Sequence, residues 1–315
     1  MPPTKLLMHL PDGFLSIPVS VLLWIISIVV IAIALRKTSR QLGEREIPLM
    51  GVLAAAIFAG QMLNFSITGG TSGHLLGAAL ATILLGPWAA ILVMTSVVSI
   101  QALIFQDGGL IALGSNLFNM AVVGVFVSYA LITIIKKFIK EEKASLFASS
   151  AISAWFSILF SALGCALELA LSGTSPANIA IPAMASIHAL IGVGEALITL
   201  GAVSFVYAAR KDLLKTSVNP KSINKGILLG GGVITLALAI LSPLASTHPD
   251  GLEWVAKKQG FLSVAGDSIY KFIPDYVMPG LNNEAVATIL AGIIGSIVVF
   301  ALVIGIAQTR RKSSS

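Results

Sequence analysis

Charged residues are scarce in this chain. Asp, Glu, Lys and Arg together make up only 11% of its 315 residues, whereas roughly a quarter of a typical soluble domain is charged. Apolar residues make up 56%, and the mean hydropathy is +0.95. So few charges exclude an ordinary soluble protein, and the composition predicts a polytopic membrane protein built from apolar helices.

Several catalytic and cofactor signatures are also missing. The one cysteine, Cys165, allows neither a disulfide within the chain nor a cysteine metal site. The sequence contains no GxxxxGK[ST] phosphate loop, HExxH zinc motif or GxSxG nucleophile turn. Residues 1–16 lack the features of a cleaved signal peptide. The missing catalytic motifs speak against an enzyme. The missing phosphate loop speaks against ATP binding by this chain through that device.

Long apolar segments recur along the sequence, many of them close to the ~20 residues that span a bilayer as a helix. Proline disrupts a helix and disfavours helical geometry in the residue before it, so Gly86-Pro87 separates the third segment from the fourth. The predicted fold class is therefore all-α, with nine membrane spans at about 17–35, 47–64, 74–86, 88–105, 111–135, 146–172, 182–208, 226–246 and 285–308.

The basic residues are not spread evenly. Of the 20 Lys and Arg residues, 16 fall in four clusters, within 36–45, 136–143, 210–225 and 310–312. Nine spans place all four clusters on one side, which the positive-inside rule makes cytoplasmic. We therefore expect the N-terminus outside and the C-terminus in the cytoplasm, and we attribute the net charge of +6 to topology rather than to a nucleic-acid partner.

The spacing of the apolar segments divides the chain into three parts. Residues 1–208 hold seven spans with short connections, and residues 209–225 form a basic linker. Residues 226–315 hold two further spans that flank an outer segment at about 247–284, in which acids and prolines are frequent. We expect a seven-helix core followed by an accessory module.

All four histidines fall in the outer half of this topology. His9 precedes the first span and His74 opens the third, both in glycine-containing loops that let the main chain approach a ligand. Imidazole is the commonest protein ligand of late first-row metals, so we predict that His9 and His74 hold a metal ion at the outer mouth. His248 is interpreted as an interfacial side chain, because histidine costs little there.

Other polar residues within the spans are candidates for supporting roles. His188 and Glu195 are seven residues apart and share a helix face. Glu195 lies near mid-span, where it is either a functional group or a structural hydrogen-bond partner. Asn116 and Asn119 open the fifth span, where they either orient a ligand or, for Asn116, cap the helix. Glu168 is expected to extend towards water.

A known family shares several of these segments. Residues 8–15, Met-His-Leu-Pro-Asp-Gly-Phe-Leu, resemble the N-terminal signature of the M-type substrate-binding (S) components of energy-coupling-factor (ECF) transporters for cobalt and nickel. Residues 249–261 are similar to the PDGLE module of the N-type accessory subunit, which here follows the M-type unit in one chain. The M-type resemblance covers residues 8–208, and its further segments are 69–75, 85–88, 107–110, 116–120 and 188–197.

This resemblance implies a function. An S component captures divalent nickel or cobalt as the transported substrate at the outer face of a prokaryotic cell membrane, with no cofactor or enzymatic activity of its own. A transmembrane coupling (T) subunit and two ATP-binding-cassette subunits would supply ATP hydrolysis. The choice between nickel and cobalt stays open. The alternative is a stand-alone secondary transporter or channel for divalent metal cations, conducting through Glu168, His188 and Glu195.

The resemblance also implies the metal ligands. In the family, nitrogens of the terminal Met-His pair and of the glycine-loop histidine hold the ion, and the matching residues are Met8, His9 and His74. A nitrogen plane suits Ni(II) or Cu(II), and low-spin Co(II) also adopts it. Seven residues precede Met8 in this sequence and would convert its amine into an amide. We therefore expect the working chain to begin at Met8.

Overall fold

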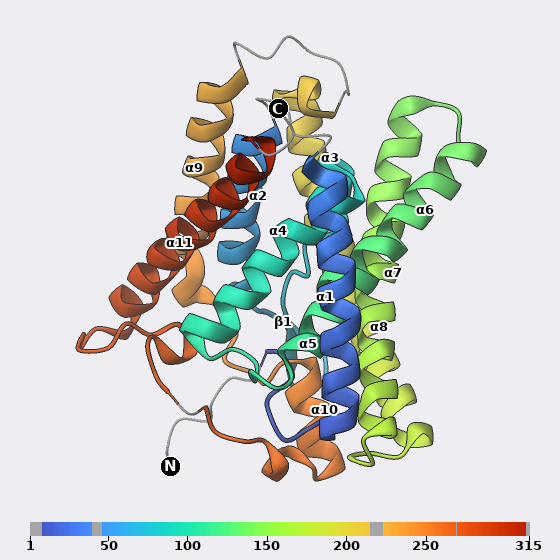
Figure 1. Cartoon of the computed structure of the whole chain (residues 1–315), viewed down its shortest axis with the longest axis vertical. Helices are drawn as coiled ribbons and strands as arrows, with labels where there is room; N and C mark the ends of the chain where they lie inside the picture. Colours follow the sequence, from blue (N-terminus) through green and yellow to red (C-terminus); the bar gives the residue numbers. More distant parts are fainter. Residues whose placement is uncertain (1–7, 40–45, 215–222, 269, 313–315) are drawn as a thin grey trace.

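The computed structural model describes residues 8–39, 46–214, 223–268 and 270–312, and helices dominate it (Figure 1). In chain order the elements are α1 (Ile17–Ser39), α2 (Glu46–Gln61), β1 (Phe65–Ile67), β2 (Thr71–Gly73), α3 (Ala78–Leu85), α4 (Pro87–Ile100), η1 (Gln101–Phe105), α5 (Leu113–Asn116), η2 (Leu117–Val123), α6 (Gly124–Phe138), α7 (Glu142–Leu171), α8 (Ala177–Ala209), η3 (Lys211–Leu214), α9 (Ile223–Leu241), η5 (Ser242–Leu244), α10 (Gly251–Gln259), η6 (Leu262–Val264), η7 (Pro274–Tyr276) and α11 (Glu284–Lys312).

Seven helical segments of the described chain are long and apolar enough to cross a membrane, by length and composition. The helix α2 is shorter, with 16 residues. The all-α polytopic fold class predicted from the sequence is therefore confirmed. The seven segments are Ile17–Thr38, Pro87–Phe105, Leu113–Phe138, Glu142–Leu171, Ala177–Ala209, Lys225–Leu244 and Glu284–Thr309.

The predicted span at 74–86 differs from a full helix. Its first residues are extended, and α3 covers only Ala78–Leu85, which is about 12 Å of helix. Gly77, with a φ of 82°, ends the extended stretch, and Gly86 followed by Pro87 ends the helix. Because a bilayer core is about 30 Å thick, α3 does not cross it alone. The extended stretch and α3 together occupy the residues of the predicted span.

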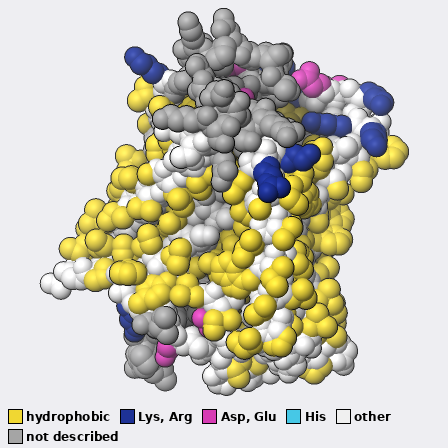
Figure 2. Space-filling view, in the orientation of Figure 1, with side chains coloured by type: hydrophobic (Ala, Val, Ile, Leu, Met, Phe, Trp, Pro, Cys, Tyr) yellow, Lys and Arg dark blue, Asp and Glu magenta, His cyan; other side chains and the backbone are white. Residues whose placement is uncertain are grey.

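The helices form one bundle. The long helices α7 and α8 pack against each other, and α9 and α11 from the C-terminal region both pack against α2. Figure 2 shows that hydrophobic side chains cover most of the middle of the visible face of the molecule. Helix α1 contributes a row of exposed aliphatic side chains to the apolar surface of the molecule. These are Ile17, Val21, Leu22, Ile25, Ile28, Val29 and Ile33. Such surfaces suit contact with lipid.

The two ends of the bundle differ in charge. Most of the Lys and Arg side chains visible in Figure 2 lie at the upper end, where α1, α6 and α8 end (Figure 1). Arg36 and Lys37 lie in the last turn of α1, and Lys136 and Lys137 lie in that of α6. The short helix α10 and the loop between η1 and α5 lie towards the opposite, lower end. Four residues of the predicted clusters, Arg40, Arg45, Lys215 and Lys221, lie outside the described residues.

Candidate metal centre

The N-terminal segment, residues 8–16, is held against the loop that precedes α5. Asn116 accepts from the Leu10 N–H and donates to the Leu10 carbonyl, both at 3.1 Å. The carboxylate of Asp12 accepts from the main-chain N–H groups of residues 110–112 at 2.8–3.1 Å. Gly109 donates its N–H to the Leu10 carbonyl, and a Cβ on Gly109 would clash with Asp12. The segment is thus fixed through its main chain, and Asn116 contributes two of the hydrogen bonds that hold it.

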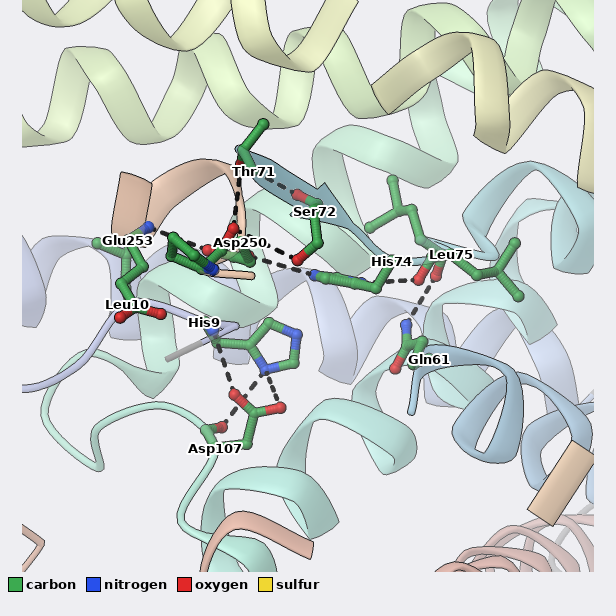
Figure 3. Close-up of polar contacts among 12 residues, drawn as sticks. His9, Leu10, Gln61, Thr71, Ser72, His74, Leu75, Asp107, Asp250 and Glu253 are labelled. Carbon is green, nitrogen blue, oxygen red and sulfur yellow. Dashed lines mark hydrogen bonds and ion pairs between the residues drawn. The ribbon is translucent and has the colours of Figure 1, made fainter. Parts of the chain in front are cut away.

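His9 belongs to this segment and is buried, since only 4% of its surface is exposed. Its main-chain N–H donates to Oδ1 of Asp107 at 3.2 Å, and its Nδ1 lies 3.4 Å from Oδ2 of the same carboxylate (Figure 3). Nε2 of His9 has no hydrogen-bond partner. Met8 precedes it and is also buried. Met1 to Leu7 lie outside the described residues, and the prediction about the chain start therefore lies there too.

His74 reaches the same place from the end of β2. Its Nδ1 lies 2.9 Å from the Leu75 carbonyl, which can only accept, so the proton belongs on Nδ1 and the lone pair on Nε2. The rings of His9 and His74 are 5.5 Å apart between centroids and nearly perpendicular. Burial, followed by the neighbouring His9, lowers the pKa of His74 below the ordinary histidine value. A neutral ring is the form that binds metal.

Glu195 holds the loop that carries His74. Its carboxylate accepts from the main-chain N–H groups of Leu76 at 2.6 Å and Gly77 at 2.9 Å, and it is fully buried. On the other side of the loop, Gln61 donates to the Leu76 carbonyl at 2.8 Å. Both carboxylate oxygens of Glu195 are thus engaged with the main chain of the loop that carries His74.

The two histidines face a small cavity of about 80 Å³. Drug-sized ligands occupy pockets of ~300–1,000 Å³, whereas a water molecule takes ~30 Å³. A metal ion with a few donors therefore fits this cavity, and an organic metabolite does not. Its polar or ionisable lining residues include His9, His74, Asn116, Asn119, Ser161, Cys165, His188 and Asp250, and its apolar lining includes Met8.

The other polar residues that the sequence analysis singled out within the spans have local partners. Nδ1 of His188 lies 2.8 Å from the Met184 carbonyl, one turn earlier in α8. Asn119 donates to both carboxylate oxygens of Glu168 at 2.9–3.0 Å, and Ser115 also donates to that carboxylate. The expectation that Glu168 extends towards water is wrong, because these two donors stabilise its carboxylate in the interior. The ring of His248 lies outside the cavity, exposed beside Ser246.

Three residues of this region escaped the sequence analysis as site residues. Asp107 contacts His9, and its Oδ2 accepts from the hydroxyl of Tyr276 at 2.6 Å. Asp250 places Oδ2 at 3.8 Å from Nε2 of His74 (Figure 3). Burial raises the pKa of the Asp250 carboxyl well above its usual range. The sequence holds one signal for Asp107 and Asp250 as site residues: each precedes a glycine within a segment that resembles the family.

Side chains alone do not supply a full coordination set here. Within the described ranges, no group of three or more His, Cys, Asp or Glu residues is arranged to hold a metal ion. Two imidazoles and a nearby carboxylate leave room for main-chain donors from the N-terminal segment. A site of this kind depends on how the main chain of Met8 and His9 is held.

Comparisons with known proteins fit this arrangement. Residues 9–213 match the family described as the cobalt uptake substrate-specific transmembrane region, CbiM, and residues 225–312 match the PDGLE domain. A putative fused nickel transport protein NikMN of Archaeoglobus fulgidus is 38% identical over 306 residues, which cover 96% of this chain and 98% of that protein. The fused nickel transport protein NikMN of Rhodobacter capsulatus is 31% identical over 251 residues, which cover 75% and 72%.

The fold has a counterpart among solved structures. The crystal structure of a truncated transition metal transporter is 36% identical in sequence, with a TM-score of 0.58. The match covers 64% of this chain and 99% of that one. Sequence and structure thus point to the same group of proteins.

Proposed function

Because this chain belongs to the family of cobalt uptake substrate-specific transmembrane proteins, we propose that it is the subunit that captures the metal ion for an ATP-driven ECF importer. It is a multi-pass membrane protein of nickel and cobalt transport and not an enzyme. In this chain the PDGLE match follows the core match, and two of its relatives are named as fused nickel transport proteins. We therefore propose Ni(II) as the preferred substrate and Co(II) as the second.

One observation carries the proposal: His9 and His74, 65 positions apart in the sequence, converge on a cavity of ion size. The proposed donors are the Met8 nitrogen, the His9 main-chain nitrogen and the rings of His9 and His74. A set of four nitrogens in a plane suits Ni(II). An ion held by the His9 main-chain nitrogen meets the ring of the same residue through Nδ1, which lies 3.4 Å from Oδ2 of Asp107, and His74 presents the lone pair of its Nε2.

The main-chain nitrogen of His9 needs a further step before it can bind. It carries a hydrogen that it donates to Asp107, and metal ligands must be deprotonated. Metal binding releases this proton to the solvent. Loading of the ion therefore exchanges a hydrogen bond to Asp107 for a bond to the metal.

The proposed topology places the cavity on the outside. The basic ends of α1 and α6 would face the cytoplasm, as the positive-inside rule requires, with the N-terminus outside and the C-terminus inside. The T subunit and two ATP-binding-cassette subunits would then supply the ATP hydrolysis for which this sequence has no phosphate loop. We retain the division into a core (1–208), a linker (209–225) and an accessory module (226–315).

The alternative, a stand-alone secondary transporter or channel, needs a chain of ionisable groups through the membrane. Glu195 is bound to the His74 loop, and Glu168 is bound to Ser115 and Asn119. Neither carboxylate lines the cavity. Carboxylates that are satisfied by structural partners do not make a conducting path, which favours the capture subunit.

Titration calorimetry of the purified chain with Ni(II) and Co(II) tests the capture site. We expect tight binding by the wild type, no measurable binding by His74→Ala, and wild-type binding by His248→Ala, whose ring is exposed outside the cavity. Wild-type affinity in His74→Ala would remove His74 from the site. Uptake into proteoliposomes with and without the ATPase subunits tests the coupling, and uptake by this chain alone down an ion gradient would favour the secondary transporter.

A further inference from the structure

The outer segment, residues 242–283 between α9 and α11, reaches the cavity. The main-chain N–H of Ser72 donates to the Pro249 carbonyl at 2.8 Å, and the Ser72 hydroxyl donates to the His248 carbonyl at 2.9 Å. This contact extends the edge of β2, the strand that leads into His74, by a short parallel bridge to Asp250. The main chain thus sets Asp250 beside His74.

Two donor atoms face each other at this contact. Nε2 of His74 and Oδ2 of Asp250 are 3.8 Å apart, which is too long for a hydrogen bond. First-row divalent ions lie about 2.0–2.2 Å from nitrogen and oxygen ligands. Two donors at right angles on one such ion lie about 3 Å apart, and two donors in line lie about 4.2 Å apart. The observed 3.8 Å falls between these values, so a shift of less than about 1 Å brings both atoms onto one ion. Both side chains line the cavity, and both are nearly completely buried.

Charge balance supports the same assignment. A divalent ion in a buried cavity requires opposite charge nearby, since an uncompensated buried charge is costly. Neutral imidazoles supply none. Asp107 lies beside His9 and Asp250 lies beside His74, so each histidine has one carboxylate next to it. Of these two acids, only Asp250 lines the cavity itself.

We propose that Asp250 is a fifth, direct ligand of the captured ion in addition to the four nitrogens, so that the C-terminal module completes the metal site of the core. This inference rests on the proposed function and deepens it. The outer segment is held in place by two further contacts: Tyr276 donates to Asp107, and Gly266 donates its N–H to the Asp12 carbonyl at 2.6 Å. A Cβ on Gly13 would clash with the Val264 carbonyl, so the segment also lies directly on the N-terminal segment.

Asp250 has a structural task that must be separated from ligation. Its Oδ1 caps α10 by accepting from the Glu253 N–H at 3.0 Å, while Oδ2 points to His74. Asparagine is as good a helix cap as aspartate. Asp250→Asn therefore keeps the cap and removes the charged donor, which makes it the informative substitution.

The test uses the full chain in lipid nanodiscs. Ni(II) and Co(II) affinities are measured by calorimetry, the coordination of bound Co(II) by its visible absorption spectrum, and folding by the unfolding temperature without metal. Asp250→Asn replaces the charged donor by a neutral amide oxygen of the same reach, so we expect affinity to fall by about ten- to a hundredfold rather than to be lost, with a changed Co(II) spectrum and an unchanged unfolding temperature. Asp267→Asn is the matched control, since Asp267 is an exposed acid of the same segment, and it should behave as the wild type.

The possible failures are distinguishable. Wild-type affinity and an unaltered Co(II) spectrum in Asp250→Asn would overturn the ligand assignment while leaving capture by His74 intact. If Asp250→Asn does not fold, Asp250→Ser keeps a capping side chain that is too short to reach the ion, and the same two readouts decide. If the wild type binds neither ion while remaining folded, the proposed function falls, and this inference falls with it.

Discussion

The N-terminal segment and the outer segment reach the same cavity from opposite ends of the chain, and they are fixed in different ways. Residues 8–16 contain no helix or strand, and the side chains of Asp12 and Asn116 hold them through main-chain hydrogen bonds. The outer segment carries its own short helices, such as the capped α10, and it presents side chains to the core. The N-terminal segment offers main-chain donors in addition to the His9 ring, whereas the outer segment offers only side chains on a preformed turn.

This difference has a physical basis. A main-chain donor cannot adjust by rotating a side chain, so its position depends on every hydrogen bond that fixes the backbone around it. A side-chain donor such as Asp250 retains rotatable bonds and tolerates small shifts of its segment. We therefore expect changes that act on the N-terminal segment to cost more metal affinity than changes that act on the attachment of the outer segment.

The largest effect should come from the chain start. A version of the protein beginning at Met8 has a free amine with a pKa of about 7.7–8.0, which can lose its proton to a metal near neutral pH. A version retaining Met1 to Leu7 has an amide there. We expect the shorter version to bind Ni(II) more than about a hundredfold more tightly, because losing a direct donor costs more than losing a supporting contact. Calorimetry of both versions measures this, and N-terminal sequencing verifies each start. Equal affinities would remove the Met8 amine from the donor set.

Asn116→Ala should have the next largest effect. It removes both hydrogen bonds to Leu10 and leaves His9 less firmly placed, so we expect Ni(II) affinity to fall by about ten- to a hundredfold, the usual cost of a lost supporting residue. Asn178→Ala, at an exposed position near the start of α8, is the control. If the affinity of Asn116→Ala stays at the wild-type value, the Met8–His9 main chain is fixed by Asp12 and Asp107 alone.

Tyr276→Phe should have the smallest effect. It removes one hydrogen bond, from the hydroxyl to Asp107, which typically contributes about 0.5–1.5 kcal/mol. We expect Ni(II) affinity to fall by no more than about tenfold. Tyr270→Phe serves as the comparison, because its hydroxyl lies 3.4 Å from the Ala102 carbonyl and away from Asp107. A loss in Tyr276→Phe as large as that in Asn116→Ala would show that both segments position His9 equally.

Helices were the most predictable part of this molecule. A membrane span corresponds to a local run of apolar residues in the sequence. The structure has helices along eight of the nine predicted spans. The ninth, at 74–86, failed as a full helix because hydropathy does not register that Gly77 and Gly86 leave only eight residues between them for α3. Glu168 was misplaced for a related reason: the two donors that stabilise it in the interior come from η2 and α5.

The amino-acid sequence by itself determined the class of the protein, the order of its helices, the side on which its charges gather and the two histidines on which the proposed site rests. Only the tertiary structure decided that Glu195 anchors the His74 loop, that Asp107 and Tyr276 lie behind His9, and that Asp250 faces His74. Apolar runs and motifs are local properties of a chain. Contacts such as that between Ser72 and Pro249, 177 positions apart, arise only when the helices have packed and brought those loops to one end of the bundle.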